Sequence, residues 1–108
     1  MSETLSKIQA LVQKRAIRVS DHAFKEMEQD DILPSEILDG VKSAVVVEDY
    51  PEANRGPSVL VLCHDRLRRP LHAVWGISNN LPGIAFVITA YRPLAELWSA
   101  DFLKRLKP

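Results

Sequence analysis

The hydrophobic pattern of this chain changes at Ala44, and that change limits the fold more than any other feature. Before it, apolar residues recur at the spacing of an amphipathic helix, as in Leu5, Ile8 and Val12. After it, segments rich in β-branched residues alternate with short loops rich in Pro, Gly and Asn. Helices followed by strands with short connections predict an α+β fold, in which the helices pack on an antiparallel sheet.

The expected elements follow from this pattern. The first helix covers about residues 3–15, the second begins after the N-cap Ser20, and a third begins at Pro34. Residues 17–19 are expected to be a short extended link. Two or three helices then pack on one face of a four-stranded antiparallel sheet. Its strands are expected at residues 44–50, 58–64, 71–78 and 84–91, and a short last helix at 99–106.

The chain has 108 residues, which predicts a single domain, 1–108. Residues 1–43 are its helical part, 44–92 its antiparallel sheet and 93–108 a C-terminal helix and tail. A single cysteine excludes an internal disulfide framework, which is typical of a reducing cytoplasm. No apolar run reaches the roughly 18 residues of a membrane span, and the polar N-terminus is unlike a signal peptide. We therefore expect a cytoplasmic protein with no membrane partner.

The charges balance overall, with 14 Lys and Arg against 14 Asp and Glu, which excludes a globally basic nucleic-acid-binding protein. The balance is uneven along the chain, because acidic residues concentrate in the helical part. Between residues 54 and 92, Asp65 stands alone against five basic residues, namely Arg55, Arg66, Arg68, Arg69 and Arg92. This local excess of about four charges is of the kind that marks an electrostatic footprint, so the zero net charge is compatible with a local phosphate-binding face.

Two histidines are candidates for chemistry. His22 is the second helical residue after Ser20, where the positive end of the helix dipole favours a neutral imidazole that can act as a base. The alternative is that it faces solvent or closes the helix start. His72 forms a polar cluster with Thr89 and Tyr91 if the strand register places them on one face. A register shifted by one residue would leave it half-buried on the solvated face instead.

Arginine side chains are candidates for phosphate binding, because a guanidinium group binds phosphate through two hydrogen bonds. Arg55 in the long loop and Arg92 after the last strand suit this role and simple solvation equally. The crowded turn at residues 66–69 favours solvation. The histidines and Cys63 lack the spacing of paired metal ligands, so we predict neither a metal site nor a cofactor.

Several segments, taken in order, are similar to one bacterial family. They are SDHAFKEME at 20–28, Ile32, residues 46–50, YPE at 50–52, RGPSVLVL at 55–62, RPLHAV at 69–74, VITAYRP at 87–93 and Trp98. Over roughly residues 15–105 the chain resembles domain-of-unknown-function family 4258. The resemblance implies a RelE-like fold, the scaffold of many small bacterial ribonuclease toxins. It also implies a type II toxin-like protein that cuts RNA, and some members lie beside a zinc-finger-type antitoxin.

By position, the family's helix histidine corresponds to His22, its strand histidine to His72 and its strand-end pair to Thr89 and Tyr91. The chain departs from the family at Glu26, where an arginine is common. Lys25 is adjacent, but on a helix it points about 100° away.

The first functional hypothesis is a metal-independent ribonuclease. His22 and His72 would be its general acid and base, and Arg55 or Arg92 would stabilise the charge on the phosphate. Tyr91 would orient or stack a base. Lys25 and Thr89 are further candidates for substrate contact. The expected partners are RNA and a cognate antitoxin protein.

The second hypothesis is a non-catalytic partner-binding or oligomerisation module on the same scaffold, such as a degenerate toxin or a homodimer. The acidic Glu26 favours it. So does the apolar surface expected on the C-terminal residues Trp98, Phe102, Leu103 and Leu106.

Overall fold

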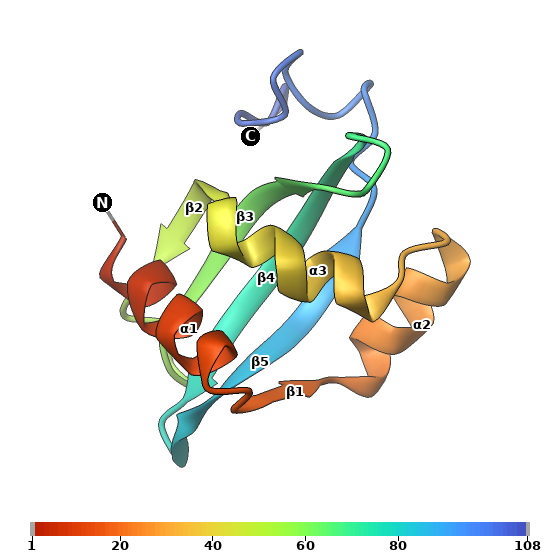
Figure 1. Cartoon of the computed structure of the whole chain (residues 1–108). Helices are drawn as coiled ribbons and strands as arrows, with labels where there is room; N and C mark the ends of the chain where they lie inside the picture. Colours follow the sequence, from red (N-terminus) through yellow and green to blue (C-terminus); the bar gives the residue numbers. More distant parts are fainter. Residues whose placement is uncertain (1, 108) are drawn as a thin grey trace.

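The computed structural model describes residues 2–107 and combines three helices with one sheet (Figure 1). The helices are α1 (Glu3–Gln13), α2 (Asp21–Gln29) and α3 (Pro34–Gly40), and a 3-10 turn, η1 (Val41–Ser43), follows α3. The strands are β1 (Ile17–Val19), β2 (Val45–Tyr50), β3 (Ser58–His64), β4 (Pro70–Ser78) and β5 (Leu81–Tyr91). The mixed α+β class predicted from the sequence is confirmed.

Each helix begins at a residue suited to the position. The Ser2 hydroxyl accepts a hydrogen bond from the Leu5 N–H at 3.0 Å, and the Ser20 hydroxyl accepts one from the Ala23 N–H at 3.0 Å. Pro34 opens α3, where its missing N–H costs nothing because the first helical donors have no partner in the helix. These signals are local, so the sequence locates the starts of all three helices.

The prediction of four strands was wrong, because the sheet has five in the order β1-β5-β4-β3-β2. Strands β2 to β5 form the expected antiparallel series. The additional strand is β1, which lies parallel to β5 with Ile17 opposite Ala85. Residues 17–19 were expected only as an extended link. Their partner lies far along the chain, and a three-residue segment carries no period that would reveal the pairing.

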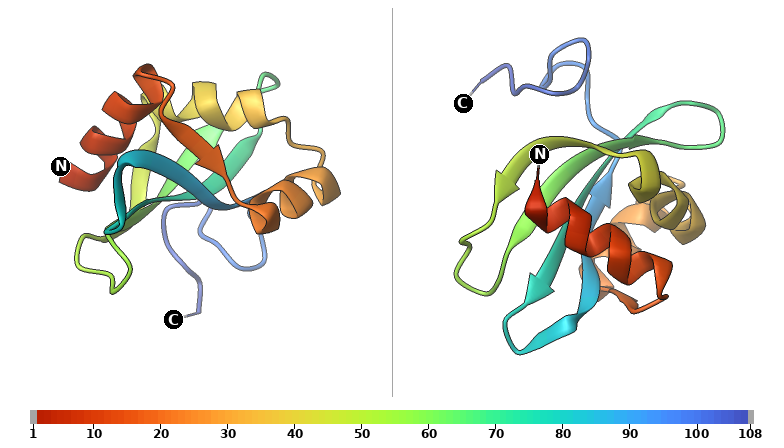
Figure 2. Two further views of the ribbon diagram at one scale, coloured as in Figure 1. Left: turned by 90° about the horizontal axis from the view of Figure 1, so that it is seen from below. Right: turned by 60° about the vertical axis from the view of Figure 1, so that its left-hand side comes forward.

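The hydrophobic core lies between the sheet and helices α1 and α3, which cover one face (Figure 2). Alternate residues of β3 and β4 point into it because successive side chains of a strand point to opposite faces. The fully buried core side chains include Ile8, Ile37, Val59, Val61, Leu71, Trp75 and Val87. Helix α2 packs beside β5.

The opposite face carries Leu60, Leu62, His72, Val74 and Gly76, and the C-terminal segment (residues 92–107) crosses part of it (Figure 2). We call this the open face. None of the described helices is long and apolar enough to cross a membrane.

The predicted helix at residues 99–106 is wrong, since the structure has turns there. The Ser99 hydroxyl accepts a hydrogen bond from the Lys104 N–H, and the Asp101 carboxylate accepts one from the Leu103 N–H. Such side-chain bonds compete with the backbone bonds of a helix. Phe102 adds a positive φ of 61°, which no helical residue adopts.

Candidate functional site

An irregularity in β5 fixes where α2 begins. Thr89 lies opposite Val74 and Val87 opposite Trp75, so Ile88 is an extra residue on β5. Ser20 binds this bulge twice: its backbone N–H donates to the Val87 carbonyl at 3.0 Å and its hydroxyl donates to the Ile88 carbonyl at 2.9 Å. The cap of α2 is therefore attached to β5, and the helix packs beside that strand.

Glu26 joins the helix to the strand at the open face. Its Oε1 atom lies 3.2 Å from His22 Nε2, and the same oxygen accepts a hydrogen bond from the Thr89 hydroxyl. The His22 side chain is 70% exposed, whereas that of Glu26 is 27% exposed. The three residues, which we call the polar cluster, present an accessible imidazole held by a carboxylate.

The strand register left open by the sequence places His72 directly opposite Tyr91. His72 Nδ1 lies 3.2 Å from the Tyr91 hydroxyl oxygen, and the two rings meet edge to face at 5.4 Å between centroids. Thr89 and Tyr91 are two residues apart on β5, so the polar cluster and the His72–Tyr91 pair follow one another along the open face.

His72 is fully buried, because the C-terminal segment covers it. Its Nε2 atom lies 2.9 Å from the Phe102 carbonyl oxygen, and Trp98 packs edge to face on its ring at 4.4 Å. Arg105 holds the segment in place: its guanidinium lies 4.8 Å from the centre of the Trp98 ring and binds the Glu48 carboxylate at 2.7 and 3.1 Å. With the segment in this position, a substrate can contact Tyr91 but not His72 itself.

Burial lowers the pKa of His72, the Phe102 carbonyl opposes that shift, Arg105 adds to it and Glu48 opposes it. In the unfolded chain the His72 imidazole is protonated near pH 6.5, whereas in the folded chain it is protonated only at lower pH. Acid therefore favours unfolding. We expect the free energy of unfolding to fall as the pH drops from 7.5 to 5.5. Urea titration at both pH values tests this, and His72→Gln should weaken the dependence. An equal pH dependence of stability in that variant would show that His72 is not its source.

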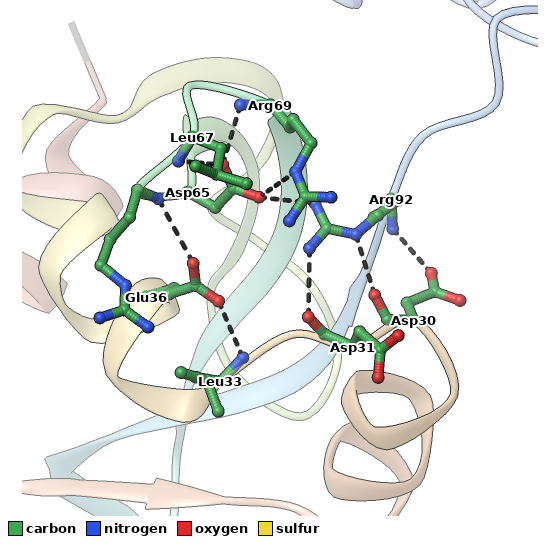
Figure 3. A network of polar contacts seen from close by, with 9 residues as sticks. Asp30, Asp31, Leu33, Glu36, Asp65, Leu67, Arg69 and Arg92 are labelled. Atoms are coloured by element: carbon green, nitrogen blue, oxygen red, sulfur yellow. Dashed lines mark hydrogen bonds and ion pairs between the residues drawn. The ribbon is translucent and has the colours of Figure 1, made fainter.

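Arg92 directly follows β5 and is held in a separate network between the β3–β4 turn and the end of α2 (Figure 3). Its backbone N–H donates to Asp30 Oδ2 at 2.8 Å and its Nε to the Asp30 carbonyl at 2.9 Å. Nη1 binds Asp65 Oδ2 at 2.9 Å, and Nη2 donates to the Asp31 carbonyl at 3.2 Å. Its donors are thus engaged within the protein.

Asp65 is the centre of this network, and its side chain has no exposed surface. Burial alone would raise its pKa. Hydrogen bonds from the Arg69 backbone, the Arg92 and Arg69 guanidinium groups and the Leu67 N–H outweigh that effect and lower the pKa to about 2. Two of the five basic residues counted in the sheet part therefore stabilise a buried carboxylate.

The remaining basic candidates do not join the polar cluster. Arg55 is exposed at the edge of a hollow lined by Ser20, Phe86 and Ile88, and Lys25 lines a different hollow between α2 and α3. Within residues 2–107 no three His, Cys, Asp or Glu side chains are grouped as metal ligands would be.

The sequence analysis did not predict that Glu26 contacts His22 and Thr89, because it considered Glu26 only as a departure from a family arginine. Its position four residues after His22 is the available signal, because side chains at that spacing meet on a helix. The cover formed by Trp98 and Phe102 had no such signal, since it depends on the path of an irregular segment.

The model of one protein family, described as a domain of unknown function (DUF4258), matches residues 19–92. No curated protein and no solved structure matches the chain. The matched region runs from β1 to Arg92 and contains the polar cluster, His72 and Tyr91. Because it covers well over half of the sequence, the chain belongs to the DUF4258 family.

Proposed function

We propose that this chain is a toxin-like ribonuclease in which His22 is the general base. The observation that carries the proposal is the contact of one Glu26 oxygen with both His22 and Thr89. A carboxylate only accepts hydrogen bonds, so it keeps the imidazole proton on Nε2 and leaves the Nδ1 lone pair free. Because the His22 side chain is 70% exposed, a substrate hydroxyl can approach it.

The proposed reaction uses the 2′-hydroxyl of RNA as the nucleophile. His22 Nδ1 takes its proton, and the 2′-oxygen forms a bond to the adjacent phosphorus as the bond from phosphorus to the 5′-oxygen breaks. The products are a 2′,3′-cyclic phosphate and, once the leaving oxygen takes a proton, a 5′-hydroxyl. His22 accepts the first proton, and a second side chain supplies the proton for the leaving oxygen.

The proton for the leaving oxygen comes from the Tyr91 hydroxyl in this scheme. Tyr91 lies two residues beyond Thr89 on β5, which is about 7 Å along a strand. Burial raises the pKa of Tyr91, so the phenol keeps its proton until a strongly basic alkoxide develops beside it. His72 Nδ1 accepts a hydrogen bond from the same hydroxyl, because its Nε2 proton faces the Phe102 carbonyl. His72 therefore positions Tyr91, and the phenolate left after the transfer takes a proton from water.

The scaffold we propose is RelE-like, as the family resemblance implies. Helices on one face of a mainly antiparallel sheet support this assignment. The exposed Arg55 supplies positive charge for RNA. The proposed partners are RNA and a cognate antitoxin protein.

The test is a cleavage assay on single-stranded RNA, with the ends of the products identified. We expect fragments that carry 2′,3′-cyclic phosphate and 5′-hydroxyl ends, and growth arrest when the protein is expressed in bacteria. Tyr91→Phe keeps the ring but removes the donor, so it should slow cleavage by about 10²-fold or more. A pure wild-type protein that neither cleaves RNA nor arrests growth would end this proposal.

A partner-binding module is the second candidate, and the surface between α2 and α3 favours it. Phe24 and Leu33, each 49% exposed, line a hollow of about 620 Å³ there together with Met27 and Ile32. Of the predicted C-terminal patch, Leu106 is 55% exposed and Phe102 and Leu103 are half-buried, but Trp98 is only 5% exposed, so this patch is a weaker candidate. A stoichiometric complex with the protein encoded beside this one, without RNA cleavage and abolished by Leu33→Asp, would favour this function.

A further inference from the structure

A second hollow, of about 400 Å³, lies on the open face beside the polar cluster. Gly76 and Phe86 lie opposite each other on β4 and β5 and form its base, and Ile88 forms a wall. Ser20 also lines the hollow, and it caps the helix that carries His22. Thr89 of the polar cluster follows Ile88 directly. The hollow and the polar cluster are thus neighbouring parts of one surface.

Two glycines keep the hollow open. A Cβ atom on Gly76 would lie 2.6 Å from Ile88 Cδ1, so a side chain there would displace the Ile88 side chain that lines the hollow. Gly56 has a φ of +131°, and a Cβ atom on it would lie 1.9 Å from the Ile77 carbonyl oxygen. Only glycine lets the loop before β3 approach β4 this closely. The loop therefore forms the rim of the hollow.

Arg55 provides the positive charge at this rim. Its backbone carbonyl accepts a hydrogen bond from the Asn79 N–H at 3.0 Å, which fixes the loop against the β4–β5 turn. Its side chain is exposed, and no carboxylate among residues 2–107 forms an ion pair with it. Unlike Arg92, its guanidinium is available for an external anion.

An aromatic ring, apolar walls and an available guanidinium at the rim match a flat ring attached to a phosphate. We propose that the hollow binds one unpaired base of single-stranded RNA next to the cleaved bond, against Phe86, with a neighbouring phosphate on Arg55. This inference rests on the proposed ribonuclease function. Stacking on Phe86 needs a free base face, so the site selects single-stranded RNA over a duplex.

Binding can be measured apart from cleavage. The probe is a fluorescently labelled single-stranded RNA hexamer with 2′-O-methyl riboses, which lack the nucleophile, and anisotropy gives its Kd. We expect Phe86→Ala to weaken binding about tenfold at every salt concentration, because a stacking contact is lost. Arg55→Gln should weaken it similarly and also reduce the salt dependence by about one phosphate contact. The matched control is Arg68→Gln, an exposed arginine in the β3–β4 turn.

Circular dichroism confirms that each variant is folded, and Gly76→Ala replaces Phe86→Ala if that variant is not. The base site would be overturned if two separate variants both bind the hexamer with wild-type affinity. These are Arg55→Gln and whichever of Phe86→Ala and Gly76→Ala is used. This holds even where cleavage of unmodified RNA continues. Weakened binding in these variants, with no cleavage by the wild-type protein, would keep the base site and reject the ribonuclease. No binding of the hexamer by the wild-type protein would overturn both.

Discussion

Replacing His22 by alanine is expected to lower the rate of RNA cleavage by about 10²–10⁴-fold, the range of a lost general base. The variant should fold normally, because the His22 side chain is 70% exposed and contributes nothing to the core. Initial rates on a single-stranded RNA, with thermal unfolding in parallel, measure the two effects separately. Loss of activity without loss of stability distinguishes a catalytic residue from a structural one.

The exposed His64 at the end of β3 provides the matched control, and His64→Ala should cleave RNA at the wild-type rate. Glu26→Gln should also lower the rate strongly, because the amide can donate to Nε2 and favour the tautomer with the proton on Nδ1, which removes the base. Thr89→Val removes one donor to Glu26 and should act in the same direction. Full activity in His22→Ala would remove His22 from the mechanism, whatever the other variants do.

The pairing of His72 with Tyr91 shows how far the sequence can be interpreted. Alternation along each strand gave the correct two faces of β4, but the choice between two registers needed the position of the bulge at Ile88. That bulge forms where the Ser20 hydroxyl binds the Ile88 carbonyl, a contact across 68 positions of the chain. Local patterns predict the strands, whereas the register depends on a contact between distant segments.

The two arginine candidates differ for a similar reason. Sequence position made Arg55 and Arg92 equal candidates for phosphate binding. The structure places Arg92 against Asp65 and the end of α2, and it leaves Arg55 exposed beside the second hollow. No spacing rule pairs Arg92 with Asp65, since they come from different strand ends. The count of basic residues along a chain therefore overestimates the charge that is available to a ligand.

Replacing Arg92 by methionine is expected to lower the midpoint of thermal unfolding by about 10 °C, because it breaks a buried ion pair from one side. The Asp65 carboxylate, whose side chain has no exposed surface, would keep Arg69 but lose the more buried of its two guanidinium partners. The carbonyls of Asp30 and Asp31 would lose their donors as well. Differential scanning calorimetry at pH 7 measures the shift.

The pH dependence of that shift identifies Asp65 as its origin. Hydrogen bonds hold the pKa of Asp65 at about 2 in the folded protein against an ordinary value of 3.8. A lowered carboxyl pKa contributes stability above about pH 4, and this contribution is lost as the pH falls toward 2. Without Arg92 the pKa of Asp65 should rise, so the difference in unfolding midpoint between variant and wild type should shrink in acid.

Arg68→Met, an exposed neighbour in the β3–β4 turn, should stay within about 2 °C of wild type throughout. A shift in Arg92→Met that is equally small would mean that the network contributes little to stability.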